Sequence, residues 1–335
     1  MPNSSAKIMF FFTLMSGMLI TVSSNSWFAA WLGLEINLLS FIPILMNNNN
    51  IYSTEAALKY FLIQVLASST FLFLIGTEIL LKTLSIKYST LIVISSPLVL
   101  KSGTAPLHWW FPSVMEGLNW NNCLIMMTIQ KIAPLILLSL LLNSSVMISL
   151  SILSILIGSI GGINQSSIRK MLTYSSINHV GWMLSALMIG ETMWIMYFVI
   201  YSMLTTTIIM IIQLLNISFT NQINMINNNL WLPKFSMSLS LLSLGGLPPF
   251  LGFLPKWIII QVLTNNNMIF QIAIMVILSL MTLYYYMRIC YSSFLILHLE
   301  PSWNYFKTNI SLSNSTFLIL SIIGLLISPS LIVFI

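Results

Sequence analysis

One apolar run, from about residue 88 to residue 114, carries a lysine, a glycine and two prolines in its second half. The run is long enough to cross a bilayer, which takes about 20 apolar residues. Proline removes a backbone donor and clashes with the preceding turn, so a helix is expected to break within residues 101–112. Backbone groups freed inside a membrane need protein or a water-filled cavity to satisfy them. Lys101 beside a broken helix therefore predicts an ion path rather than a lipid-facing surface.

The composition of the whole chain agrees with a membrane location. Of its 335 residues, 58% are hydrophobic and 5% are charged, whereas soluble domains carry about 25% charged residues. The formal charge of +6 comes from scattered cations that form no basic patch, which argues against nucleic-acid binding. The two cysteines lie far apart without a CxxC spacing, and the three histidines are separated, so neither an iron–sulfur cluster nor a metal or haem site is indicated. The composition predicts a polytopic membrane protein.

Apolar runs separated by polar residues predict about eleven transmembrane helices, of which the broken run is the fourth. The other expected spans are 8–23, 27–46, 53–81, 121–142, 146–163, 170–189, 192–216, 236–263, 268–294 and 316–335. The first is interpreted as a retained helix rather than a signal peptide, because no clear small-residue cleavage site follows it. The polar segment 221–229 predicts a surface loop.

The fourth and ninth expected spans share an unusual composition, since each contains Gly, Pro and one Lys. They lie five spans apart, and an odd offset reverses the direction of crossing. Residues 1–145 and 146–298 are therefore expected to form two inverted five-helix repeats of a single membrane domain, followed by a loop and a last helix in 299–335. Interrupted spans at matching places in two halves indicate a transporter's binding path. The predicted helix breaks are at Pro106, Pro248 and Pro249.

An odd number of spans places the two termini on opposite sides of the membrane. Six of the twelve Lys and Arg residues fall on or near the N-terminal side, namely Lys7, Arg169, Lys170, Lys234, Arg288 and Lys307. Lys82 and Lys87 flank the other side. The positive-inside rule then places the N-terminus in the cytoplasm or its organellar counterpart.

Four ionisable side chains are expected near the middle of spans, where a charge costs roughly 2.5–3.5 kcal/mol. They are Glu35, Lys101, Lys131 and Lys256. Lys131 lies about ten residues from either end of its span, or about 15 Å at the helical rise, so its ammonium does not easily reach the interface. Intramembrane ionisable residues indicate function by default, and these four are candidate proton carriers. The alternatives are structural ion pairs and lysines that extend to the interface.

Glu35 is the acid deep in a span that lies near these lysines in the sequence. A pair with Lys101 would hold the lysine charged, and separation of the pair would let the apolar surroundings drive off its proton. A static salt bridge fits the sequence equally well. His108 and His179 are candidate proton relays, because imidazole titrates near neutral pH, and a structural hydrogen-bonding role is the alternative for each.

Four motifs together carry a family resemblance. They are Lys101-Ser-Gly-Thr-Ala-Pro-Leu-His-Trp-Trp-Phe-Pro112, Gln130-Lys-Ile-Ala-Pro134, Arg169-Lys-Met-Leu-Thr-Tyr-Ser-Ser-Ile-Asn-His-Val-Gly181 and Gly245-Gly-Leu-Pro-Pro-Phe-Leu-Gly-Phe-Leu-Pro-Lys-Trp257. In this order they resemble motifs of the antiporter-like subunits of respiratory complex I. The length, the Asn-rich loops and the segments 31–37 and 53–61 resemble the mitochondrially encoded members of that family, especially those of insects.

The resemblance implies a proton-translocating core subunit of the membrane arm of NADH:ubiquinone oxidoreductase, in the mitochondrial inner membrane with its N-terminus in the matrix and its C-terminus towards the intermembrane space. Glu35 and Lys101 would be the coupling pair, Lys131 the central carrier and Lys256 the exit-side lysine. Its partners would be other membrane-arm subunits, lipid, protons and water. Flavin, iron–sulfur clusters and ubiquinone would belong to other subunits, so this chain is expected to hold no cofactor or metal. The alternatives are a stand-alone cation/proton antiporter and a structural membrane scaffold subunit.

Overall fold

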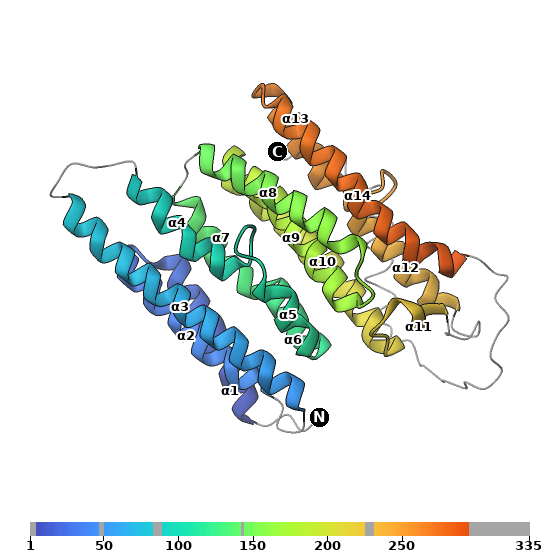
Figure 1. Ribbon diagram of the computed structural model, residues 1–335, viewed down its shortest axis with the longest axis horizontal. Coiled ribbons are helices and arrows are strands. Elements are labelled where there is room, and N and C mark those ends of the chain that lie inside the picture. The colour runs from blue at the N-terminus through green and yellow to red at the C-terminus, as the bar shows by residue number, and fades with distance from the viewer. Residues whose placement is uncertain (1–4, 47–49, 83–88, 142–143, 225–230, 295–335) are drawn as a thin grey trace. The chain divides into compact units, whose positions relative to one another are not determined.

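The computed structural model of the chain describes residues 5–46, 50–82, 89–141, 144–224 and 231–294. In these residues it contains fourteen helices and one isolated antiparallel bridge, between Ser167 and Phe219 (Figure 1). The helices are α1 (Ser5–Ser23), α2 (Trp27–Leu45), α3 (Ile51–Lys82), α4 (Ser89–Ser102), α5 (Trp110–Gly117), α6 (Trp120–Met127), α7 (Ile129–Ser139), α8 (Ser144–Ile163), α9 (Ile168–Ile189), α10 (Glu191–Leu215), α11 (Thr220–Asn224), α12 (Trp231–Gly245), α13 (Phe253–Asn265) and α14 (Ile269–Phe294). The all-α class is confirmed.

Seven helical segments in the described residues are long and apolar enough to cross a membrane. They are α1, α2, α3, the α6–α7 pair, α8, α10 and α14. The fourth and ninth expected spans are each divided into two short helices, α4 with α5 and α12 with α13. The count of eleven stays a prediction, and the span expected at 316–335 lies outside the described residues.

Two segments differ in detail from the expectation. The fifth span, expected near 121–142, is present over Trp120–Ser139. It is interrupted between α6 and α7 at Thr128, whose φ of −113° and ψ of −79° depart from helical geometry. The polar segment expected to be a loop from residue 221 begins inside the short helix α11. Neither departure has a glycine or a proline at its position, so the usual local signals are missing.

The helices pack as two compact units, residues 1–150 and 151–335, with the division inside α8. In the first unit α2 packs between α1 and α3, α3 packs on α4 and α5, and α7 packs on α4 (Figure 1). In the second unit α10 packs on α9 and α12, α14 packs on α12, and α13 contacts α9, α10 and α14. These contacts bring the two halves of each broken span against continuous helices of the same unit.

Small residues allow α1 and α2 to approach closely. A Cβ atom added to Gly33 would lie 2.8 Å from the carbonyl oxygen of Gly17, and one added to Gly17 would lie 2.9 Å from the backbone nitrogen of Asn37. Lipid tails are as apolar as leucine, so helices in a bilayer associate largely through such close packing. This contact sets the position of α2, which carries Glu35 and Asn37.

The first half of the broken fourth span ends at a left-handed glycine. Gly103 has a φ of +69°, a conformation that a side chain disfavours. Its N–H donates to the Leu100 carbonyl at 3.2 Å, and the Thr104 N–H donates to the Val99 carbonyl at 3.2 Å. These two bonds form a Schellman motif, which satisfies carbonyl groups of the last turn. Pro106 follows in the connection to α5.

The first half of the broken ninth span ends in the same way. Gly246 has a φ of +85°, its N–H donates to the Ser243 carbonyl at 3.1 Å, and the Leu247 N–H donates to the Leu242 carbonyl at 3.4 Å. Pro248 and Pro249 then lie in the connection to α13. In both spans the helix ends at a glycine a few residues before the prolines, so the glycine stops the helix and the proline prevents it from resuming.

Candidate functional site

Lys101 occupies the last turn of α4, just before the Schellman motif, and only 7% of its surface is exposed. The carbonyl end of a helix favours a cation, because the partial charge there is negative. Carbonyl groups of this turn are also held by side chains from other segments. The Lys101 carbonyl accepts a hydrogen bond from Gln64 Nε2 at 3.5 Å, and the Leu100 carbonyl accepts one from Trp110 Nε1 at 3.1 Å. The broken helix end is therefore anchored to α3 and α5.

Lys131 lies near the start of α7, directly after the interruption at Thr128, and is 2% exposed. Its Nζ atom is 5.0 Å from the centroid of the Phe111 ring. A cation within about 6 Å of an aromatic ring centroid is attracted by the electrons of the ring face. Phe111 belongs to α5, so the second half of the broken fourth span lies against the buried amine of the fifth.

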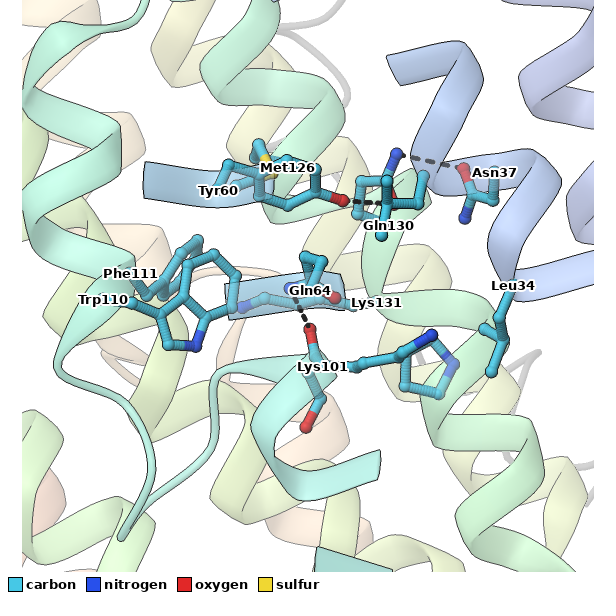
Figure 2. Close-up of a pocket in the computed structure, with 13 residues that line it drawn as sticks. Leu34, Asn37, Tyr60, Gln64, Lys101, Trp110, Phe111, Met126, Gln130 and Lys131 are labelled. Carbon is cyan, nitrogen blue, oxygen red and sulfur yellow. Dashed lines mark hydrogen bonds between the residues drawn. The ribbon is translucent and has the colours of Figure 1, made fainter. Parts of the chain in front are cut away.

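Lys101 and Lys131 line the same cavity, which has a volume of about 20 Å³. A single water molecule needs roughly 10–15 Å³, so the cavity is large enough for one water. The other lining residues drawn in Figure 2 are Leu34, Leu38, Asn37, Tyr60, Gln64, Ser102, Trp110, Phe111, Met126, Gln130 and Pro134. Helices far apart in the sequence thus meet around two buried amines.

Three uncharged polar side chains form a hydrogen-bonded chain along this cavity. Tyr60 donates to Gln130 Oε1 at 3.4 Å, and Gln130 Nε2 donates to Asn37 Oδ1 at 3.1 Å (Figure 2). The motifs and charges of the sequence did not indicate a role for these residues or for Gln64. Amide side chains deep inside apolar spans are a signal that could have identified them, since such groups need partners in a membrane.

Glu35 lies on α2 and is partly exposed, and it is not among the residues that line the cavity. It acts electrostatically on the Lys101 ammonium. No ion pair within 4.0 Å joins the two side chains, although both belong to the described part of the chain. The arrangement is therefore a charge interaction across a gap rather than a closed salt bridge.

Lys256 belongs to the second unit and has its own surroundings. It lies on α13, is 5% exposed, and donates from Nζ to the Gly245 carbonyl at 2.9 Å. Gly245 is the last residue of α12, so the ammonium caps the negative end of that half-helix. The Nζ atom also lies 6.0 Å from the centroid of the Trp182 ring on α9. The lysine thus joins the two halves of the broken ninth span.

The two candidate histidines are both buried. His108, in the connection between α4 and α5, has its Nδ1 atom 3.2 Å from the Pro106 carbonyl, and it is not among the cavity-lining residues. His179, on α9, has its Nδ1 atom 2.9 Å from the Tyr197 hydroxyl on α10. The Tyr201 ring centroid lies 5.0 Å from that of His179. Tyr197 is a contact that the sequence did not indicate.

The structure therefore brings Lys101 and Lys131 to one cavity in the first unit. Glu35 interacts electrostatically with Lys101 but forms no ion pair with it. Lys256 and His179 lie in the second unit. Within the residues that the structure describes, no group of three or more His, Cys, Asp or Glu side chains is placed to hold a metal ion. The cavity thus places two titratable amines beside space for one water molecule.

Comparison with known proteins identifies relatives over most of the chain. The sequence profile of the NADH:quinone oxidoreductase/Mrp antiporter transmembrane family matches residues 24–282. A relative named NADH-ubiquinone oxidoreductase chain 2, from Anopheles gambiae, is 49% identical over 324 residues, which cover 94% of this chain and 95% of the relative.

Two solved structures resemble the fold. A chain of respiratory complex I from Thermus thermophilus has a TM-score of 0.80 at 22% identity, covering 98% of this chain and 81% of that one. A chain of the Mrp complex from Dietzia sp. has a TM-score of 0.74 at 16% identity, covering 84% of this chain and 59% of that one. At these identities the likeness shows a shared fold alone.

Proposed function

Because the chain belongs to the transmembrane family of NADH:quinone oxidoreductases and Mrp antiporters, and within it to NADH-ubiquinone oxidoreductase chain 2, we propose that it is a proton-translocating core subunit of the membrane arm of respiratory complex I. One observation carries the proposal: two buried lysine amines, Lys101 and Lys131, line one polar cavity inside an apolar helix bundle. A charge held there costs several kcal/mol, and a protein that only needed a packed core would use apolar side chains.

The proposed roles follow the positions of the side chains. Lys101 exchanges its proton as the influence of Glu35 changes, and the absence of a closed ion pair leaves that influence adjustable. Lys131 receives the proton through the shared cavity and passes it on. Lys256 is the exit-side lysine, held by a helix end rather than by an acid. His108 and His179 are proposed relays, the second through its contact with Tyr197.

We propose that residues 1–145 and 146–298 are inverted five-helix repeats, and that the N-terminus faces the matrix while the C-terminus faces the intermembrane space. The matching Schellman motifs at Gly103 and Gly246 support the repeat, because they stop corresponding helices with the same backbone turn. The excess of Lys and Arg on the N-terminal side supports the orientation.

The proposed location is the mitochondrial inner membrane, and the proposed partners are the other membrane-arm subunits, lipid, protons and water. Electron transfer through flavin, iron–sulfur clusters and ubiquinone is assigned to other subunits of the complex. This subunit then contributes to NADH:ubiquinone reduction by coupling it to proton movement. Its own residues supply the titratable groups and the protein walls around them.

A stand-alone cation/proton antiporter is the less favoured function. The Mrp chain shares the fold at 16% identity, whereas the Anopheles gambiae relative is 49% identical along nearly its whole length. The sequence also contains no Asp, and Glu35 is the one acid assigned to the proposed proton path. Few carboxylates are therefore available to bind a metal cation.

Replacement of Lys101 with Arg tests the proposal, because arginine keeps the positive charge but does not release its proton in proteins. In the assembled complex, Lys101→Arg is expected to lower NADH-driven proton pumping at least about tenfold, a barrier increase of about 1.36 kcal/mol. The measurement is acidification of membrane vesicles on addition of NADH, normalised to the amount of assembled complex.

Lys59→Arg is the matched control, since Lys59 is exposed and its 2.6 Å ion pair with Glu55 can be retained by arginine. It should pump normally. Normal pumping by Lys101→Arg as well would show that the charge alone matters, and the scaffold function would then be the better account.

A change at Gly246 should act on Lys256 without removing it. An added Cβ would lie 2.9 Å from Lys256 Nζ, and a φ of +85° costs an alanine about 1–2 kcal/mol. The contacting atom is the end of a flexible side chain, so the lysine should be displaced while the complex still assembles. Gly246→Ala is expected to reduce pumping several-fold, whereas Gly190→Ala, with no atom within 4 Å of the added Cβ, should not. Equal pumping by both variants would contradict the role given to this lysine.

A further inference from the structure

The first turn of α7, which carries Lys131, is weakly held by its own helix. The N-cap residue Thr128 does not cap the turn, because its hydroxyl donates backward to the Leu124 carbonyl at 2.7 Å. Pro134 has no N–H, so the Gln130 carbonyl lacks the usual helical hydrogen bond from the residue four positions later. Contacts from other helices therefore contribute more than usual to fixing the direction in which this turn points.

The Gln130 side chain supplies that restraint. Its amide oxygen accepts from the Tyr60 hydroxyl of α3 at 3.4 Å, and its amide nitrogen donates to Asn37 Oδ1 of α2 at 3.1 Å. Both partners are buried, each with 3% of its surface exposed. Because its two partners lie on two different helices, the amide is held in one orientation. This restrains the rotation of the first turn of α7 about the helix axis.

Gln130 and Lys131 are consecutive, so a rotation of this turn moves both side chains together. Figure 2 shows the Gln130 amide between Asn37 and Tyr60, while the Lys131 chain runs across the cavity towards the Phe111 ring. All of these side chains line the cavity that also contains Lys101. If the clamp on Gln130 were lost, the turn could rotate and the Lys131 amine would leave its place beside the Phe111 ring.

We propose that Gln130 is a positioning residue for proton transfer at Lys131: its amide, clamped between Asn37 and Tyr60, holds the first turn of α7 so that the lysine amine faces the shared cavity. The inference rests on the proposed function, because it gives Gln130 no chemistry of its own. An amide neither gives up nor takes up a proton at neutral pH, so its contribution is geometric.

The chain offers a matched control for a merely structural amide. Asn122 Nδ2 donates to the Ile44 carbonyl at 3.1 Å, which joins α6 to α2. Asn122 is buried and lies on the same interrupted span as Gln130, but it does not line the cavity. Replacement of Asn122 by leucine removes one interhelical hydrogen bond, and replacement of Gln130 removes two. Of the two residues, only Gln130 is adjacent to Lys131 in the chain.

In the assembled complex, Gln130→Leu is expected to lower NADH-driven proton pumping about tenfold, with an unchanged KM for ubiquinone. The solvent deuterium isotope effect on the rate should rise, because proton transfer at a misplaced Lys131 becomes rate-limiting. Asn122→Leu should leave the isotope effect unchanged. Tyr60→Phe removes only the hydroxyl that donates to Gln130. It should lower the pumping rate and raise the solvent isotope effect, each by less than Gln130→Leu does. The double variant Tyr60→Phe/Gln130→Leu should be no slower than Gln130→Leu alone, since both changes act on one clamp.

The positioning role is overturned if Gln130→Leu matches Asn122→Leu in both rate and isotope effect. If Gln130→Leu does not assemble, Tyr60→Phe decides the question by the same readouts, and an unchanged isotope effect there overturns the role. Lys101→Arg separates this outcome from failure of the proposed function. Normal pumping by Lys101→Arg would contradict the proposed proton-translocating function itself. Blocked pumping by Lys101→Arg, together with normal kinetics in Gln130→Leu, would contradict only the positioning role.

Discussion

Replacement of Lys131 with Met is expected to reduce NADH-driven proton pumping to the background of inhibited membranes while the complex still assembles. Methionine has a similar length and fills irregular space well, so the walls around the 2% exposed side chain should be kept. What is lost is the titratable amine in the cavity shared with Lys101. Without it, a proton leaving Lys101 has no carrier on α7.

The same variant should keep or raise the thermal stability of the complex. A buried ion carries a desolvation cost of several kcal/mol, and replacement by an apolar side chain removes that cost. Some of the gain is offset by the lost attraction to the Phe111 ring, which is worth about 0.5–2 kcal/mol. Loss of activity with no loss of stability is the signature of a residue present for function.

Two measurements check this prediction: vesicle acidification per NADH oxidised, and the midpoint of thermal unfolding of the purified complex. Lys59→Met, at an exposed position on α3, serves as the control and should change neither by much. Normal proton pumping by an assembled Lys131→Met complex would contradict the carrier role, and a marked fall in thermal stability would favour a structural ion pair.

Gly252→Ala should prevent the second unit from folding correctly. Gly252 lies in the connection between α12 and α13, and an added Cβ would overlap the carbonyl oxygen of Ser243 in α12. That oxygen belongs to the backbone of a helix, so it cannot move aside as a side chain does. The φ of −66° is ordinary, so the whole effect is steric. We expect a loss of more than about 3 kcal/mol, at the upper end of overpacking effects.

The amount of assembled complex and its unfolding temperature report this loss. Gly76→Ala provides a control of opposite sign, because Gly76 lies within α3, is exposed, and has no atom within 4 Å of an added Cβ. Alanine in a helix interior is favoured over glycine by roughly 0.5–1 kcal/mol. Normal assembly of Gly252→Ala would show that the two halves of the ninth span do not approach as closely as the structure places them.

Much of the fold followed from local sequence patterns. Continuous apolar runs located α1, α2, α3, α8, α10 and α14 to within a few residues, since a helix that crosses lipid must be predominantly apolar over about 20 residues. The breaks in the fourth and ninth spans were also predictable, because Gly and Pro act on their immediate neighbours. The burial of Lys101, Lys131 and Lys256 followed from their distance to the ends of these runs.

The interruption of the fifth span at Thr128 was not predictable in this way. Residues 126–129 contain neither Gly nor Pro, and Pro134 lies six residues after the interruption. The polar contacts of the cavity were equally hidden, since Gln130 is 93 residues from Asn37 and 70 residues from Tyr60. Which of several amides meets which partner depends on how the helices pack, not on their neighbours in the chain.

From its sequence alone this protein was identified as a helical membrane protein of a known family, with lysines buried beside broken helices, because hydropathy, Gly and Pro act over a few residues. Only the tertiary structure showed that Lys101 and Lys131 share a cavity, that the Gln130 amide bridges two helices beside them, and that Lys256 caps the end of α12. Those contacts join residues distant in the chain, and their geometry is set by the close packing of helices, which no local pattern records.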